Sequence, residues 1–193
     1  MLFIDTETTG KVNGKLPAVD NAQPHIMQLG LLAYTDTRKV AEFELLLKPL
    51  HYKESDIAPE AIEVHGITYD DCRLYGVTDY TALHFFTQLY LAADTVIAHG
   101  WGHEDLVLRK WYYTNGVANP PLRPSKHYCT MLEFSKHFKL PGARWNKWPK
   151  LSEMYKFFHG SEFPNAHTAL ADAKATAACY YSMQQALTPA VTE

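Results

Sequence analysis

The sequence has few cysteines and no long apolar run. Its three cysteines are an odd number, widely spaced, and form no Cys-x-x-Cys pair: Cys72, Cys129 and Cys179. This pattern argues against a disulfide framework or a zinc knuckle and fits a reducing cytoplasm. No apolar stretch approaches the length of a membrane span, so we expect no membrane partner. Asp5 stands where a signal peptide would have its apolar region, so we expect a cytoplasmic location.

A strong net charge is also missing, since the 193 residues carry a formal charge of −3. The charge is unevenly distributed. Residues 126–156 hold seven basic and two acidic side chains, a charge of +5, so the rest of the chain carries −8. A basic segment in an acidic chain is a candidate contact surface for phosphates.

The composition, 47% apolar and 20% charged, is that of a globular chain, and the length fits one domain. The apolar patterning predicts strands at residues 2–4, 25–34, 40–48, 95–98 and 127–130. It predicts helices at 59–64, 79–91, 102–113, 131–138, 151–158 and 168–187. Three early strands followed by alternating helices and strands predict an α/β sandwich with a mixed sheet.

An acidic pair follows the first strand directly. Asp5 and Glu7 are two residues apart, so on a continuing strand both side chains leave the same face. Neighbouring carboxylates repel each other, and a hard cation such as Mg²⁺ or Mn²⁺ relieves the repulsion. The alternative is a solvated strand end.

Two further acids, Asp105 and Asp172, fall in the first turns of predicted helices. Acids at this position interact favourably with the helix dipole without any function. His167 precedes Asp172 by five residues, which that explanation does not cover. His99 and His103 are four residues apart and would share a helix face as zinc ligands, but no third ligand stands at a matching spacing.

Taken together, these motifs resemble the DEDDh (DnaQ-like) 3′–5′ exonucleases, which include the proofreading epsilon subunit of bacterial DNA polymerase III, ribonuclease T and oligoribonuclease. The resemblance rests on residues 5–10 (Asp-Thr-Glu-Thr-Thr-Gly), on Ala98-His99 followed by Asp105, and on His167 separated from Asp172 by four residues. Residues 24–30 and 59–68 are also similar to family segments. The resemblance covers about residues 1–187, which we expect to form a single exonuclease domain, with a short C-terminal tail at 188–193.

The resemblance implies a ribonuclease-H-like fold, a five-stranded mixed sheet flanked by helices. It also implies two divalent cations, Mg²⁺ or Mn²⁺, held by four carboxylates, with His167 as general base. The ligands carried over by position are Asp5, Glu7, Asp105 and Asp172. The implied substrate contacts in the first two motifs are Thr6, Thr8, Thr9, Gly10 and His99.

The chain departs from the family pattern at three places. Gly100 stands where the family often has Asn, and Glu104 stands where an apolar or aromatic residue usually precedes the Asp. The second departure leaves open which acid, Glu104 or Asp105, faces the cations. We expect Asp105, because leucines follow it as in the family. The loop at 11–24 is also longer than in compact members.

The basic segment suggests the path of the substrate. Arg144, Trp145, Lys147 and Trp148 lie in an irregular stretch where charges can contact phosphates and rings can stack on bases. We expect single-stranded DNA as the substrate, with short or single-stranded RNA as the alternative. A catalytically silent nucleic-acid-binding module is a third reading, which the intact acids disfavour. A DNA polymerase is a possible partner, but the absence of a tether after about Leu187 favours free-standing action.

Overall fold

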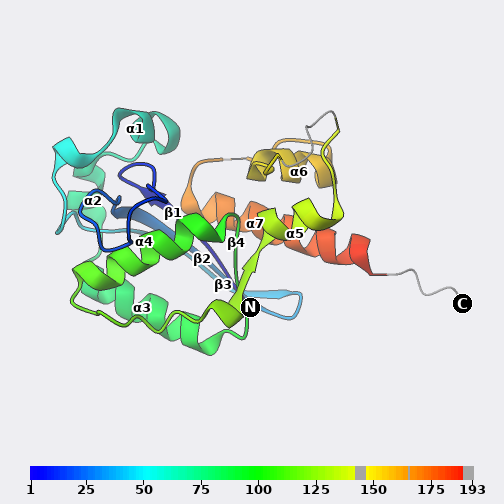
Figure 1. The fold of residues 1–193 in the computed structure, drawn as a ribbon, viewed down its shortest axis with the longest axis horizontal. Coiled ribbons are helices and arrows are strands. Elements are labelled where there is room, and N and C mark those ends of the chain that lie inside the picture. The colour runs from blue at the N-terminus through cyan, green and yellow to red at the C-terminus, as the bar shows by residue number, and fades with distance from the viewer. Residues whose placement is uncertain (142–146, 165, 189–193) are drawn as a thin grey trace, which may run out of the picture.

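One mixed sheet forms the centre of the molecule (Figure 1). The computed structural model describes residues 1–141, 147–164 and 166–188. In these ranges the strands are β1 (Leu2–Thr8), β2 (Ile26–Thr35), β3 (Arg38–Leu46), β4 (Val96–Ala98) and β5 (His127–Cys129), in the order β3-β2-β1-β4-β5. The first three strands are antiparallel neighbours, and β4 and β5 run parallel to β1. The predicted five-stranded mixed sheet is confirmed.

Seven α-helices are present in the described ranges: α1 (Pro59–His65), α2 (Tyr69–Tyr75), α3 (Asp79–Ala92), α4 (Trp101–Thr114), α5 (Thr130–His137), α6 (Leu151–His159) and α7 (Ala169–Leu187). Two 3₁₀ turns are also present: η1 (Glu54–Asp56) lies between β3 and α1, and η2 (Pro124–Lys126) lies between α4 and β5. The helix α2 was not among the helices predicted from the sequence. Its signal is a capping box, in which the Asp71 N–H donates to the Thr68 hydroxyl (3.1 Å) and the Thr68 N–H donates to the Asp71 carboxylate (2.9 Å).

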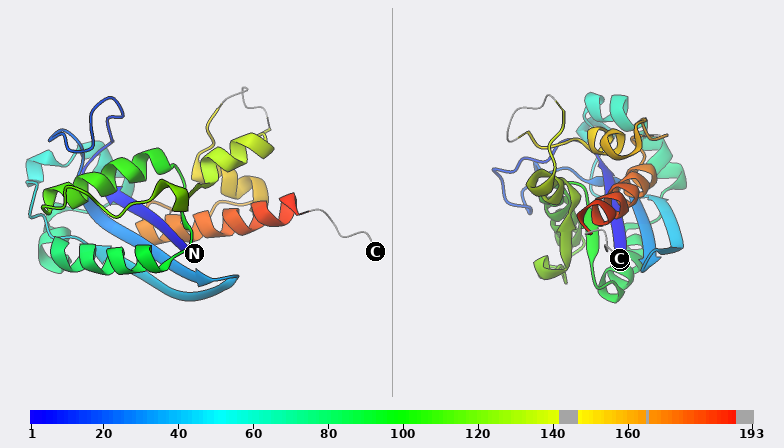
Figure 2. Two further views of the ribbon diagram at one scale, coloured as in Figure 1. Left: turned by 60° about the horizontal axis from the view of Figure 1, so that its bottom comes forward. Right: turned by 90° about the vertical axis from the view of Figure 1, so that its right-hand side faces the viewer.

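Side chains alternate along β1, so neighbouring residues pack against different helices on the two faces of the sheet. Leu2 and Ile4 pack with α3 and α4 in the main core, whereas Phe3 packs on the other face against Ala177 of α7. Since side chains alternate, Asp5 and Glu7 leave the sheet on the α7 face. Figure 2 shows α7 running along the sheet toward a smaller group formed with α5 and α6.

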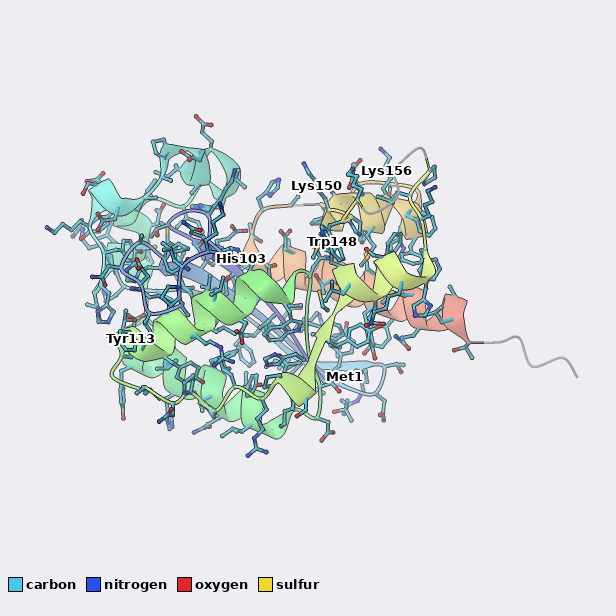
Figure 3. The ribbon with its side chains drawn as sticks, viewed as in Figure 1. Met1, His103, Tyr113, Trp148, Lys150 and Lys156 are labelled. Atoms are coloured by element: carbon cyan, nitrogen blue, oxygen red, sulfur yellow. The ribbon has the colours of Figure 1, made fainter. Side chains whose placement is uncertain are left out.

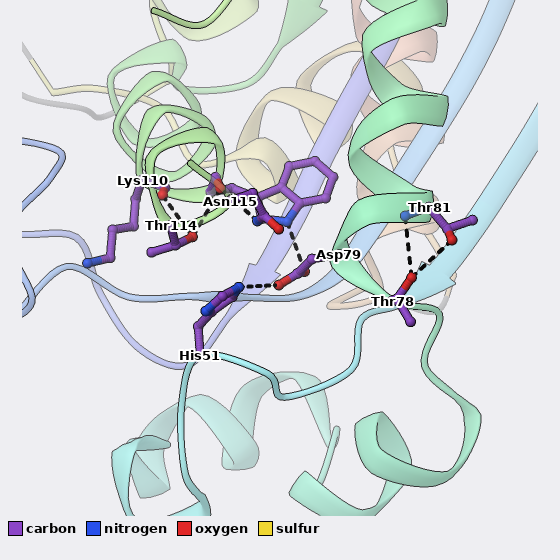
Figure 4. Close-up of polar contacts among 8 residues, drawn as sticks. His51, Thr78, Asp79, Thr81, Lys110, Thr114 and Asn115 are labelled. Atoms are coloured by element: carbon purple, nitrogen blue, oxygen red, sulfur yellow. Dashed lines mark hydrogen bonds and ion pairs between the residues drawn. The ribbon is translucent and has the colours of Figure 1, made fainter. Parts of the chain in front are cut away.

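A buried polar cluster fixes α4 relative to the start of α3 (Figure 4). The indole N–H of Trp111 donates to Asp79 Oδ1 at 2.9 Å, and His51 Nε2 lies 3.3 Å from Asp79 Oδ2. Asp79 is only 5% exposed, so its carboxylate needs such partners. The cluster thereby holds the helix that carries the second acidic motif.

The N-terminus of α7 is held against β2 by two features. The Ala169 N–H donates to the side-chain oxygen of Gln28 at 2.9 Å. A Cβ on Gly30 would lie 2.2 Å from the backbone of Ala169, so only glycine permits this approach. Gly30 pairs with Asp5 across the sheet, so the first turn of α7 lies over the acidic strand.

No helix in the three described ranges is long and apolar enough to cross a membrane.

Candidate active site

Three predicted acids meet on the α7 face of the sheet. Asp5 and Glu7 come from β1 and Asp172 from the first turn of α7, and each offers a carboxylate oxygen within 4.8 Å of the other two. Although Asp172 is 165 residues or more away in sequence, the docking of α7 over β2 brings it to the strand. All three side chains are partly exposed, so the cluster is open to a ligand.

A fourth acid joins the cluster from α4, and it is Glu104. This side chain is 3% exposed, and its Oε2 accepts a 3.0 Å hydrogen bond from the Thr6 hydroxyl on β1. Its charge raises the pKa of Asp5, and the charge of Glu7 raises its own pKa. The cluster therefore combines acids from β1, α4 and α7.

Our expectation that Asp105 faces the acidic pair is wrong. Asp105 forms an ion pair along the helix with Arg109, with Nε to Oδ2 at 2.7 Å, and its charge acts on Tyr90 and His127. Successive residues of a helix point about 100° apart, so only one of two neighbouring acids can face β1. The helix begins at Trp101 after Gly100, which adopts a positive φ of 94°, and this start directs Glu104 to the strand.

Burial and mutual repulsion shift the pKa values of the clustered acids upward. Burial, with repulsion from Glu104, Asp172 and Glu7, raises the pKa of Asp5 well above its ordinary value. Burial and Asp172 raise the pKa of Glu7 to about 7, and burial raises that of Glu104 to about 8 against the opposing Thr6 hydrogen bond. The pKa of Asp172 is raised by burial as well. Such shifts mark a site that lacks compensating positive charge.

The chain after Glu7 forms a tightly bonded turn. The Thr8 hydroxyl donates to the Gly10 carbonyl at 2.7 Å, and the Thr9 hydroxyl accepts from the His25 N–H at 3.0 Å. His65 Nδ1 accepts from the Ile67 N–H at 3.0 Å, so its Nε2 carries the proton and donates to the Thr8 carbonyl at 3.2 Å. The three predicted threonines are buried and bonded within the protein, and Gly10 is half-buried.

A protein-family model for exonucleases, RNase_T, matches residues 2–180. The chain belongs to this exonuclease family. The predicted membership of the DEDDh (DnaQ-like) exonuclease family is thereby confirmed. A comparison with curated proteins finds no match.

Solved exonuclease structures share the fold. The chain is similar to E. coli exonuclease I in complex with a dT13 oligonucleotide, with a TM-score of 0.74 and 20% identity. It is also similar to the zinc-bound form of the E. coli exonuclease I complex with single-stranded DNA, with a TM-score of 0.74 and 21% identity. These matches cover 95% and 96% of this chain but 40% of each exonuclease I chain. They confirm the ribonuclease-H-like fold.

His167, the predicted general base, lies next to the cluster in the backbone. Its backbone N–H donates to Asp172 Oδ1 at 3.2 Å, and its residue adopts a positive φ of 74°. Thr168 then caps α7 by accepting from the Ala171 N–H at 3.3 Å. The His167 side chain is exposed, so its ring is accessible from solvent.

The other residues predicted to contact the substrate do not form one group in the structure. His99 is bonded inside the protein, between the Thr130 hydroxyl and the Pro149 carbonyl, both at 3.0 Å. Lys147 is ion-paired with Glu153 of α6. Arg144, Trp145 and residues 189–193 of the predicted tail lie outside the described residues.

The donor set fits a hard divalent cation. Four carboxyl groups supply only oxygen ligands, which Mg²⁺ and Mn²⁺ prefer. No lysine or arginine is paired with Asp5, Glu7, Glu104 or Asp172 in the described part of the chain. A cation would therefore supply the positive charge that these mutually repelling groups need.

Proposed function

We propose that this chain is a metal-dependent 3′–5′ exonuclease that removes nucleotides from the 3′ end of single-stranded DNA. The observation that carries the proposal is the convergence of four carboxyl groups from β1, α4 and α7, with His167 beside them, in a chain of the exonuclease family. We further propose that residues 1–187 form a single exonuclease domain.

Two cations, Mg²⁺ or Mn²⁺, would be held by Asp5, Glu7, Glu104 and Asp172. Bound there, they would supply an activated water and neutralise the charge that develops on the leaving 3′ oxygen. Asp5 is repelled by each of the other three acids, so it lies at the centre of the charge cluster and would help to hold the cations. Glu104 takes the ligand role that the sequence assigned to Asp105.

His167 is the proposed general base. A histidine can take a proton from an attacking water near neutral pH. Its side chain is exposed, and the residue directly precedes Thr168, the N-cap of the helix that carries Asp172. The hydrogen bond from its backbone N–H to Asp172 holds the residue next to a proposed metal ligand.

The 3′-terminal nucleotide would lie against the turn formed by residues 8–10. This turn follows Glu7 directly, and its hydroxyl groups are already bonded, so the backbone is rigid before substrate arrives. A rigid site limits the entropy that is lost on binding. Thr6 contributes indirectly, since its hydroxyl holds Glu104.

DNA is the favoured substrate because the similar exonuclease I structures contain a dT13 oligonucleotide and single-stranded DNA. An exoribonuclease is the second candidate, and contacts with the 2′-hydroxyl would distinguish the two. The silent-module reading is weaker, because a cluster of repelling acids costs stability and serves no purpose in simple binding. Association with a DNA polymerase stays a prediction.

The test is cleavage of 5′-labelled single-stranded DNA and RNA oligonucleotides in Mg²⁺, Mn²⁺ or EDTA. We expect a ladder that shortens from the 3′ end and is lost in EDTA, in Asp5→Ala and in His167→Ala. The faster polymer identifies the substrate. Absence of cleavage of both polymers in both metals would contradict the proposal, and oligonucleotide binding by the same protein would then favour the silent module.

A further inference from the structure

An exposed tryptophan stands in a short segment that is fixed on both sides. Trp148 is 57% exposed, whereas Trp101 and Trp111 are buried at 6% and 4%. Glu153 of α6 holds a residue on each side of Trp148. Its carboxylate pairs with the Lys147 ammonium and accepts a hydrogen bond from the Lys150 N–H at 2.9 Å. The backbone around the indole is therefore held, while the ring itself faces solvent.

A second contact ties the same segment to the end of β4. His99 Nε2 lies 3.0 Å from the Pro149 carbonyl oxygen, which can only accept, so this nitrogen carries the ring proton. The other nitrogen, Nδ1, accepts from the Thr130 hydroxyl at 3.0 Å. Burial lowers the pKa of His99 to about 4, so the ring stays neutral and keeps both bonds at ordinary pH. His99 thus fixes the position of Pro149, the residue next to Trp148.

This anchor lies level with the acidic cluster. Phe3 of β1 pairs with Ile97 of the parallel strand β4. Two residues further on, Asp5 within β1 and His99 just after the end of β4 therefore lie at about the same level of the sheet. Neighbouring strands are about 4.8 Å apart. Figure 3 shows Trp148 and Lys150 beside α6, and His103 at the start of α4 in the middle of the view.

We propose that Trp148 stacks on a base of the single-stranded substrate on the 5′ side of the scissile phosphate, with the Lys150 ammonium near the adjoining backbone. The proposal rests on the function proposed above. With the 3′-terminal nucleotide at the cluster, the rest of the strand extends only on its 5′ side. A fixed aromatic ring beside an exposed cation is the combination that binds single strands without reading sequence.

The geometry favours nucleic acid over a protein partner at this position. Trp148 is flanked by two lysines, and the acidic cluster lies at the adjacent strand end, where a phosphodiester and its cations must lie in the proposed reaction. A protein ligand would have to place its backbone across the same opening. His99 is then a positioning residue, which acts through Pro149 rather than on the substrate.

The test is a double-mutant cycle between Trp148 and the bases of the substrate. The Kd of 5′-labelled dT oligonucleotides is measured in EDTA at fixed salt for wild type, Trp148→Ala and Trp148→Phe. A single abasic residue is placed at successive positions from the 3′ end. We expect Trp148→Ala to weaken binding about 5- to 150-fold, the range of stacking on one base, and Trp148→Phe to restore most of it.

At one position, the abasic residue should raise the Kd of wild type and leave the Kd of Trp148→Ala unchanged, because the variant has no ring to stack on that base. Lys150→Gln should reduce the slope of log K against log salt by about one. The matched control is Tyr113→Ala, an exposed ring (49%) at the far end of α4, which should leave Kd unchanged (Figure 3). Equal Kd for wild type and Trp148→Ala, or equal losses for both proteins at every abasic position, would overturn the proposal.

Chemistry is measured separately with thymidine 5′-(p-nitrophenyl) phosphate, which has no base on the 5′ side. Trp148→Ala should hydrolyse this ester at the wild-type rate. If wild type fails to hydrolyse both the ester and the oligonucleotides, the proposed exonuclease function is refuted, while the binding cycle still decides whether Trp148 stacks. A lower rate for Trp148→Ala on the ester would instead show that the residue supports the catalytic site and would overturn its assignment to upstream stacking.

Discussion

Replacing Glu104 by Gln should stabilise the metal-free protein at alkaline pH. The side chain is 3% exposed and its pKa is raised to about 8 from the ordinary 4.5. An acid with a raised pKa in the folded state binds its proton more tightly when folded than when unfolded. Between about pH 4.5 and 8 the folded state therefore holds more protons, and stability falls as pH rises.

The shift sets the size of the effect. Since one pKa unit corresponds to about 1.4 kcal/mol, the upper limit is on the order of 5 kcal/mol. Relaxation and water entry reduce the cost of a buried charge, so we expect about half of this limit. For a domain of this size the melting temperature of Glu104→Gln should exceed that of wild type by about 5–10 °C at pH 8 in EDTA. The amide oxygen of Gln still accepts the Thr6 hydrogen bond.

The assay is thermal unfolding followed by circular dichroism from pH 5 to 8.5 in EDTA. Wild type should lose stability across this range, and Glu104→Gln should show a flatter profile. The control is Asp105→Asn, which removes a one-third exposed ion pair with Arg109 and should change stability by less than about 1 kcal/mol at any pH. Our reasoning would be refuted if wild type were equally stable at pH 5 and pH 8, or if Asp105→Asn flattened the profile and Glu104→Gln did not.

Three further results are expected. Mg²⁺ at 100 times its Kd should stabilise wild type by about 2.7 kcal/mol at pH 8 and stabilise Glu104→Gln much less, as calorimetry can show. His167→Asn should lower kcat about 10²- to 10⁴-fold with an unchanged oligonucleotide Kd; a loss in binding alone would argue against the general base. Gly30→Ala should cost about 1–3 kcal/mol or more in urea unfolding, because its Cβ meets the Ala169 backbone. Gly14→Ala, where nothing lies within 4 Å, is its control.

Most of the sheet and six of the seven described helices could be predicted, because their apolar periods are regular. The acidic pair was also predictable, since strand alternation alone places Asp5 and Glu7 on one face. Apolar periodicity does not predict which elements distant in sequence approach each other closely. The contact between Gly30 and Ala169, which brings Asp172 over β1, depends on the absence of a side chain and appears only in three dimensions.

The choice between the two neighbouring acids of α4 was within reach of the sequence. Glu104 lies on the apolar stripe that includes Trp101, Leu108 and Trp111, all of them buried, so the helical period places it on the inner face. Asp105 stands four residues before Arg109, the spacing of an ion pair on a helix. Following the family's leucine pattern concealed this periodic signal.

The internal order of the loop at 11–24 was not predictable. Gln23 is 2% exposed, and its side chain bonds the backbone of Asn13 in both directions, accepting at 3.0 Å and donating at 2.8 Å. Lys110 of α4 adds a 2.9 Å hydrogen bond to the Asp20 carbonyl. Each contact joins residues whose types are common in loops, so no local pattern announces it.

The acidic cluster is stabilised by the rest of the fold rather than by its own contacts. Its members repel one another, yet the Thr6 hydrogen bond holds Glu104 to β1, and Gln28 holds the start of α7 above the strand. These contacts persist whether or not the acids are charged, so the fold fixes the site before any cation binds. Removing one charge should therefore raise stability and remove function together, as expected where activity requires a strained arrangement. A variant at Glu104 that lost both stability and activity would show instead that this carboxyl group supports the fold.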